Sequence, residues 1–385
     1  MTFQVDSFVS VWEKKTKSPM ITVKKVIYSI TLVGAWFFFA TLFYKTICVV
    51  LLFLVWRKVL AEKVPKRYRN LSIRAVWLCL GFTLWIAMPR YRINSGDRVR
   101  LLYVDKEGNT QRPPISHWLL SMLLPEEEIV NVGVKCIEYN APLIRMAGLG
   151  NTLIEQAQND INSGKIGNFF KPYKRLGLNN PISGVYSQVF NEKLGTNYNA
   201  FYLCEPKHYD RNKAYPLIVF CHGYLGNWQM YQGLWKDLDG AIVASIGTRD
   251  LSGIFGQQDI NSIFNFYIPM LERMGYLVDH QQIHLMGLSN GVSSINAAMH
   301  SRHVMDFKSI TSISCNLDGL RRMPCQVNLI GGGKDNSAGR MPAQYRELRK
   351  MRVDADIFFD TDENHYIMVN KREEILSFIK ERLAM

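Results

Sequence analysis

Residues 283–301 read IHLMGLSNGVSSINAAMHS, and this stretch decides the fold. Its first five residues are a short continuous apolar run, which is typical of a buried strand in a parallel sheet. The last ten residues, VSSINAAMHS, suit a helix. Between the two stands Gly287-Leu288-Ser289-Asn290-Gly291, a G-x-S-x-G sequence in the strand–turn–helix context of a nucleophile elbow.

The glycines Gly287 and Gly291 have a steric task in such an elbow. The turn is so tight that the serine takes strained dihedral angles, and side chains two positions to either side would collide. The strain lifts the hydroxyl of Ser289 into the open, above the N-terminus of the helix. A bare G-x-S-x-G also fits a plain turn, so the flanking strand and helix are what indicate a nucleophile.

Short apolar runs of the same kind recur along the C-terminal 200 residues. They are PLIVFCHG (216–223), AIVASIG (241–247), SITSISC (309–315), CQVNLIGG (325–332) and DIFFD (356–360). Helical segments, one of them a long stretch at about 259–276, separate several of these runs. Short buried strands that alternate with helices predict an α/β fold with a doubly wound, mostly parallel sheet. Such sheets place their chemistry at the carboxyl ends of the strands.

The region upstream of residue 216 is less regular. VYSQVF (185–190) and NAFYLCEP (199–206) alternate like paired strands across a Gly-Thr-Asn turn. RVRLLYVDKEGNTQRP (98–113) predicts a short hairpin with its turn at 106–109, and TLIEQAQNDINSG (152–164) predicts a helix. HWLLSMLLPEEEIV (117–130) fits either an amphipathic helix near a membrane or a helix packed on the sheet.

A serine hydroxyl is a poor nucleophile without a base, and the base needs orienting. Asp335 stands at the carboxyl end of one predicted strand, and His365 lies in the loop after the last one. The order Ser289, Asp335, His365 is that of α/β-hydrolases. Asp318, just after SITSISC, is the runner-up acid.

Three other histidines are expected to have structural roles and no part in catalysis. His284 lies inside a predicted strand and is expected to pack in the core. His300 and His303 lie near the end of the helix after the elbow, where surface or capping roles are expected.

The sequence His222-Gly223-Tyr224 ends an earlier strand. A His-Gly turn there can aim the backbone N–H of Tyr224 at a developing oxyanion, with the N–H of Asn290 as the partner donor. The competing interpretation is an ordinary glycine-rich turn between a strand and a helix. The presence of the elbow favours the functional interpretation.

These residues resemble a known group. NAFYLCEPKHYDRNKAYPLIVFCHGYLGN (199–227), HQQIHLMGLSNG (280–291), GGGKDN (331–336) and ENHYIM (363–368) resemble the esterases of the poly(3-hydroxybutyrate) depolymerase and predicted-peptidase branch of the α/β-hydrolase superfamily. The resemblance covers about residues 183–385. It implies Ser289, Asp335 and His365 as the catalytic triad and the Tyr224 and Asn290 amides as oxyanion donors. Val292 departs from the group, which often has a second glycine there.

The N-terminal quarter has a different character. Residues 26–56 are apolar except for Lys45, and residues 71–89 form a second apolar run, so each is long enough to span a bilayer. Residues 1–100 hold 17 Lys and Arg against four acids, whereas residues 101–385 are balanced. Because the whole excess of +13 flanks the apolar runs, it indicates anionic lipid surfaces and not nucleic acid. The charges on either side of the spans leave the membrane side of the C-terminal part open.

The seven cysteines form no C-x-x-C pair, and no Cys/His cluster has zinc spacing. No metal or organic cofactor is expected, because two-step acyl transfer by a serine requires neither. The expected organisation is a basic N-terminal segment (1–25), a multi-pass membrane anchor with two spans (26–89), an accessory or linker region (90–182) and a hydrolase domain (183–385). The expected activity is cleavage of a small-molecule or lipid-like ester, or of an amide, through an acyl-enzyme. The alternatives are a peptidase, an acyltransferase, and a non-catalytic membrane protein that uses the fold for binding.

Overall fold

The computed structural model describes residues 26–33, 47–52, 54, 98–141, 148–166, 183–197 and 199–383. Contacts divide the chain into two units. The sheet and its helices, apart from residues Glu127–Val132 of one helix, belong to the unit made of Arg90–Glu126 and Gly133–Met385. In the other unit the described residues 26–33, 47–52 and 54 are helical.

Most of the predicted spans 26–56 and 71–89, and the N-terminal segment 1–25, lie outside the described residues. Within the part of the chain that is described, no helix has the length and apolar character needed to cross a membrane.

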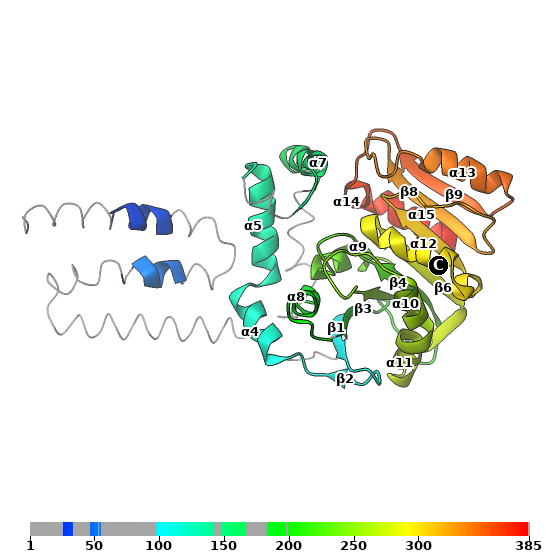
Figure 1. Cartoon of the computed structure of the whole chain (residues 1–385), viewed down its shortest axis with the longest axis horizontal. Helices are drawn as coiled ribbons and strands as arrows, with labels where there is room; N and C mark the ends of the chain where they lie inside the picture. The colour runs from blue at the N-terminus through cyan, green and yellow to red at the C-terminus, as the bar shows by residue number, and fades with distance from the viewer. Residues whose placement is uncertain are drawn as a thin grey trace, which may run out of the picture. The chain divides into compact units, whose positions relative to one another are not determined.

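One nine-stranded sheet organises the larger unit, in the order β2-β1-β3-β5-β4-β6-β7-β8-β9 (Figure 1). The pairs β1–β2, β1–β3 and β3–β5 are antiparallel. The pairs β5–β4, β4–β6, β6–β7, β7–β8 and β8–β9 are parallel. The strands are β1 (Val99–Val104), β2 (Thr110–Gln111), β3 (Asn199–Cys204), β4 (Tyr215–Cys221), β5 (Ile242–Ile246), β6 (Val278–Leu288), β7 (Ser309–Ile313), β8 (Gln326–Gly332) and β9 (Ala355–Asp360). The predicted mostly parallel α/β sheet is confirmed.

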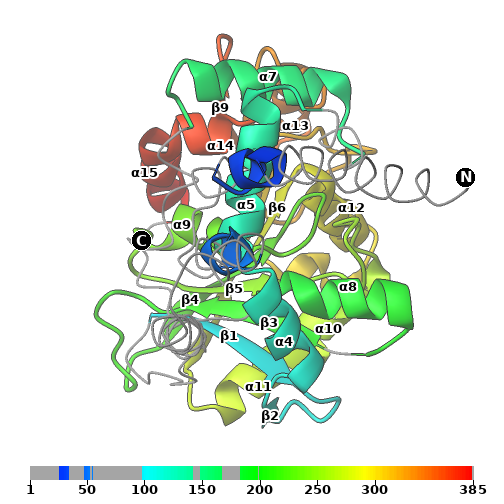
Figure 2. The same ribbon diagram turned by 90° about the vertical axis from the view of Figure 1, so that its left-hand side faces the viewer.

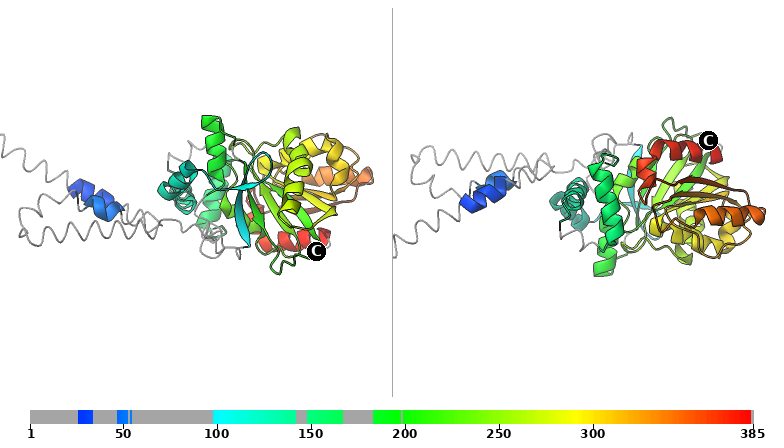
Figure 3. Two further views of the ribbon diagram at one scale, coloured as in Figure 1. Left: turned by 90° about the horizontal axis from the view of Figure 1, so that it is seen from below. Right: turned by 90° about the horizontal axis from the view of Figure 1, so that it is seen from above.

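Helices cover both faces of this sheet, as Figure 3 shows for the red α15 and the yellow-green helices opposite it. One face carries α10 (Gln257–Ser262), α11 (Ile268–Arg273), α12 (Ser293–Met299) and α13 (Met341–Lys350), and the other carries α9 (Gln232–Trp235), α14 (Ile367–Asn370) and α15 (Arg372–Leu383). The remaining helices are α4 (Ile115–Leu123), α5 (Glu126–Glu138), α7 (Asn151–Asn162) and α8 (Val185–Leu194).

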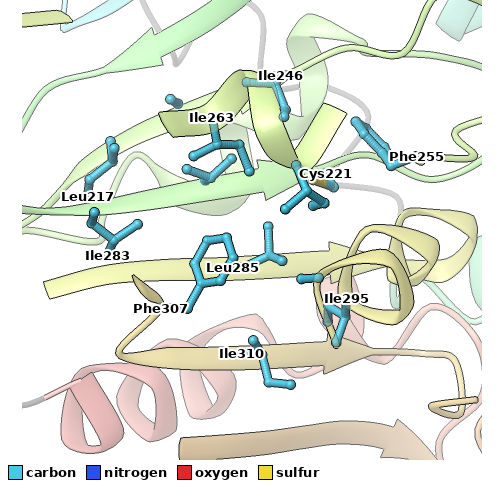
Figure 4. Close-up of a cluster of buried hydrophobic side chains, with 14 of the residues drawn as sticks. Leu217, Cys221, Ile246, Phe255, Ile263, Ile283, Leu285, Ile295, Phe307 and Ile310 are labelled. Atoms are coloured by element: carbon cyan, nitrogen blue, oxygen red, sulfur yellow. The ribbon is translucent and has the colours of Figure 1, made fainter. Parts of the chain in front are cut away.

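Strand β4 shows why these runs are apolar throughout. Leu217, Val219 and Cys221 enter one core cluster, whereas the alternate residues Ile218 and Phe220 enter the other. Successive side chains of a strand point to opposite faces, so a strand with helices on both sides is apolar at every position. Figure 4 shows the first cluster, where residues of α12 and of the π-helical turn Ile263–Tyr267 meet the strands. This rigid centre fixes the ends of the strands.

The predicted hairpin of residues 98–113 is confirmed as β1 and β2, with Gly108 at φ +81° in the turn. It does not stand apart, because β1 pairs along its whole length with β3. The sheet therefore begins upstream of residue 183.

The strand predicted at VYSQVF (185–190) is wrong, because these residues form the first turns of α8. Val185 and Val189, like Tyr186 and Phe190, are four residues apart, a spacing that places each pair on one face of a helix. The helix ends at Gly195, whose φ of +66° is the left-handed conformation of a helix C-cap. The apparent alternation of apolar residues was a helical repeat too short to identify.

The side chains of three histidines are fully buried, namely His117, His222 and His284. We therefore expect the free energy of unfolding to decrease in acid. Burial lowers the pKa of each from its ordinary 6.5 to about 4. Between these pH values the unfolded chain binds protons that the folded chain does not, so the free energy of unfolding decreases as the pH falls. Each histidine adds a slope of about 1.4 kcal/mol per pH unit.

Urea unfolding of the detergent-solubilised protein at several pH values between 7.5 and 4 measures this slope. The variant His284→Gln is expected to lower it by one histidine's share, and His300→Gln, at an exposed position, to leave it unchanged. A free energy of unfolding that does not vary over this range would contradict the expectation.

Candidate active site

The elbow forms where β6 ends and passes through a 3₁₀ turn, Ser289–Val292, into α12. Ser289 has φ +53°, a left-handed conformation that is strained for a residue with a side chain. A Cβ atom on Gly291 would lie 2.2 Å from the carbonyl oxygen of Cys221, and one on Gly287 would lie 2.5 Å from that of Gly291. Gly291 is therefore required by the close approach of the turn to the end of β4, and Gly287 by the tightness of the turn itself.

The structure brings Ser289, His365 and Asp335 together in a hydrogen-bonded series. The Oγ of Ser289 lies 3.0 Å from Nε2 of His365, and Nδ1 of the same ring lies 2.9 Å from Oδ2 of Asp335. Ser289 follows β6, Asp335 follows β8 and His365 follows β9. Because these parallel strands point the same way, their carboxyl ends meet at one edge of the sheet.

The carboxylate of Asp335 is well suited to orient the ring, since the residue is only 2% exposed. Its Oδ1 accepts a hydrogen bond from the backbone N–H of Ser337 at 2.9 Å, which fixes the carboxylate plane. The runner-up acid, Asp318, is engaged elsewhere, since its Oδ2 accepts from the side chain of Asn296.

His284 and His300 have the roles that the sequence suggested, whereas the surface or capping role expected for His303 is wrong, because this residue is buried. His284 is buried in the sheet with Nδ1 2.8 Å from Oγ of Ser309. Nδ1 of His300 lies 2.8 Å from the carbonyl oxygen of Asn296 near the end of α12. His303 stacks on Phe264.

The His-Gly turn lies against the nucleophile. A Cβ atom on Gly223 would be 3.2 Å from Cβ of Ser289. The backbone N–H of Tyr224 donates no hydrogen bond among the described residues. Asn290 is the second residue of the 3₁₀ turn, where a backbone N–H has no partner within the helix. Gly223, the residue before Tyr224, and Asn290 thus both lie next to Ser289.

His222 shapes this turn through its hydrogen bonds. Its Nδ1 donates to the carbonyl oxygen of Gly223 at 2.7 Å, while Nε2 accepts from the side chain of Gln188 at 2.9 Å and from the N–H of Thr248 at 3.3 Å. Because burial lowers its pKa to about 4, the ring is neutral. Gln188 was missed from the sequence because its segment was assigned to a strand.

Helix α7 supplies further polar contacts that the sequence did not reveal. The side chain of Gln156 bonds to the backbone of Lys334 and His365, and the carboxylate of Asp160 bonds to Asn364. Across the described ranges, no group of three or more His, Cys, Asp or Glu side chains is arranged to hold a metal ion.

Strand order and the elbow after β6 together decide the architecture. The chain has the α/β-hydrolase fold. No protein-family model matches the sequence, and a comparison with curated proteins finds no match.

Solved structures that are similar include two esterases and a peptidase. A ferulic acid esterase is 16% identical with a TM-score of 0.40, over 50% of this chain and 95% of its own. An esterase from Pyrobaculum calidifontis is 14% identical with a TM-score of 0.40, over 49% of this chain and 81% of its own. An acylaminoacyl peptidase from Pyrococcus horikoshii is 16% identical with a TM-score of 0.38, over 48% of this chain but only 39% of its own.

The contact of the elbow with β4 predicts that Gly291→Ala is poorly tolerated. The new methyl group meets backbone carbonyl oxygens, which cannot move aside without displacing the strand, so the expected loss of stability is about 3 kcal/mol or more. Gly133→Ala in α5 is the matched control, because no atom of the described residues beyond its chain neighbours and its own helix backbone lies within 4 Å of the added Cβ. It should stabilise the helix by about 0.5–1 kcal/mol. Thermal unfolding measures both, and equal midpoints would refute the steric argument.

Proposed function

We propose that this protein is a membrane-anchored serine hydrolase that cleaves an ester or amide bond through an acyl-enzyme. The observation that carries the proposal is the hydrogen-bonded series Ser289, His365 and Asp335 at the carboxyl edge of the sheet, with Ser289 raised on a strained turn. Each member has the geometry that its role requires.

In the first step His365 takes the proton of Ser289 as Oγ bonds to the substrate carbonyl carbon. The distance of 3.0 Å between Nε2 and Oγ is within reach of this transfer. Asp335 holds the ring and stabilises the imidazolium. The Tyr224 and Asn290 N–H groups donate to the oxyanion of the tetrahedral intermediate.

In the second step the intermediate collapses, the scissile bond breaks, and His365 gives its proton to the leaving group. Water then repeats the sequence on the acyl-enzyme, with His365 as base, and releases the acid. These steps require no metal or organic cofactor. Transfer of the acyl group to another acceptor would use the same first step.

The proposed substrate is a lipid-like ester. The support is the pair of apolar runs at 26–56 and 71–89 with their basic flanks, which would hold the hydrolase beside a bilayer. Proximity to lipid raises the local concentration of amphiphilic esters.

Reaction with a fluorophosphonate probe tests the nucleophile on the detergent-solubilised full chain. Wild type is expected to be labelled, and Ser289→Ala and His365→Ala to lose labelling. Asp335→Asn should slow it by about 10⁴-fold. Asp318→Asn is the matched control, expected to react as wild type, because Asp318 pairs with Asn296 and not with His365. Absence of labelling in a folded wild type, judged by circular dichroism, would favour the non-catalytic binding protein.

The anchoring is tested separately. Membranes that contain the full chain are washed with alkaline carbonate, which removes peripheral proteins. An integral protein with two spans stays in the pellet until detergent is added. Release of the chain by carbonate alone would refute the anchor while leaving the hydrolase proposal intact.

A further inference from the structure

Helix α7 lies beside α14 and the turn that carries His365 (Figures 1 and 2). It belongs to the same compact unit as the catalytic residues but comes before β3 to β9 in the chain. The roles proposed for Ser289, His365 and Asp335 make no use of it. Its polar side chains nevertheless converge on the active-site turns.

Gln156 bridges the two turns that bear the acid and the base. Its Nε2 donates to the carbonyl oxygen of Lys334, the residue before Asp335, at 2.9 Å. Its Oε1 accepts from the backbone N–H of His365 at 3.4 Å. A single side chain therefore links the turn of Asp335 to that of His365.

Asp160 holds the histidine turn from both sides. Its Oδ2 accepts from the side-chain amide of Asn364 at 2.8 Å and from that of Asn370 at 2.9 Å. Asn364 directly precedes His365, and Asp160 is only 5% exposed. Hydrogen bonds to a buried carboxylate are stronger than those between neutral groups.

An ion pair between Lys165 and Glu363 extends this support. Nζ of Lys165 lies 3.1 Å from Oε1 of Glu363, whose Oε2 accepts from the amide of Asn370 at 2.8 Å. The hydrogen bond that the Lys165 ammonium donates to Glu363 raises the pKa of this ammonium. Two carboxylates, from α7 and from the turn itself, thus share the amide of Asn370.

The buried apolar residues of α7 are sufficient to pack the helix against the domain, so its polar hydrogen bonds are not needed for packing. Ile154 and Ala157 are buried, and a helix that served only to cover the domain would need no more than such contacts. Here the backbone N–H of His365 points to Gln156, its carbonyl oxygen accepts from Oγ of Ser314 at 2.9 Å, and both ring nitrogens are engaged in the site. Gln156 thus supplies a partner for the one remaining polar group of His365.

We infer that Gln156 and Asp160 are positioning residues, through which α7 holds His365 in line with Ser289 and Asp335. This inference rests on the proposed hydrolase function. A displacement of about 1 Å at a reacting group can cost 10²-fold in rate, because the reacting atoms then lose their alignment. The region between residues 148 and 166 would in this case position the side chains of the active site.

The test measures fluorophosphonate labelling of the full chain over a range of probe concentrations. Each variant gives a maximal rate constant, which reports alignment, and a half-saturating concentration, which reports binding. Gln156→Met removes both hydrogen bonds at similar volume, and Asp160→Asn removes the charge. Each is expected to lower the maximal rate constant about 10–10²-fold with an unchanged half-saturating concentration. Glu155→Gln, on the exposed side of α7, is the control and should match wild type.

Circular dichroism and thermal unfolding accompany every variant. A folded Gln156→Met or Asp160→Asn chain with the wild-type rate constant overturns the inference, while the proposed function stands. If one variant fails to fold, the other variant decides. If both fail to fold, α7 has a role in stability alone, and this result also overturns the inference. A folded wild type without labelling overturns the proposed function together with this inference.

Discussion

The close contact between the elbow and the end of β4 is the constraint on which the rest of the site depends. Gly291 faces the carbonyl oxygens of Cys221 and His222 with no room for a side chain. This contact holds Ser289 at its positive φ and presses the His-Gly turn against the same serine. Ser289 and the His-Gly turn are therefore placed by one steric contact between two neighbouring strands, independently of Asp335 and His365.

The acid and the base come from the other side of the elbow strand. Strands β8 and β9 run parallel in register from Val327↔Ala355 to Gly332↔Asp360, so their following turns begin at the same height. The turns are joined directly, because the N–H of Lys334 donates to the carbonyl oxygen of Glu363 at 2.8 Å. The sheet brings His365 to Asp335, and hydrogen bonds from the backbone, from Ser314 and from α7 set the final orientation.

Much of this arrangement could be predicted from the sequence, for physical reasons. The buried strands are uninterrupted apolar runs, and the elbow needs two glycines around a serine, so both have local signatures. The meeting of Ser289, Asp335 and His365 follows from the rule that parallel strands end at one edge. Asp335 and Asp318 both follow predicted strands, so both are candidates for the acid under this rule. The structure joins Asp335 to His365.

What could not be predicted has no local signature. Gln188 and Asp160 are polar residues on helices, where a solvated surface is the ordinary expectation, and their partners lie far away in the chain. The six residues VYSQVF were too few to separate a period of 2 from one of 3.6. The two apolar runs near the N-terminus remain a prediction from composition and length.

The hydrogen bond between Asn364 and Asp160 joins residues 204 positions apart. During synthesis at roughly 5–20 residues per second, α7 leaves the ribosome about 10–40 seconds before its partners exist. Contacts of such long range also close late in folding, because the loop entropy is spent before they form. The turn that carries His365 is thus made later than the helix that holds it, and the contact between the two forms late. A nascent chain that contains Ser289 but not yet His365 would lack the side chain that lies 3.0 Å from the serine hydroxyl in the folded protein.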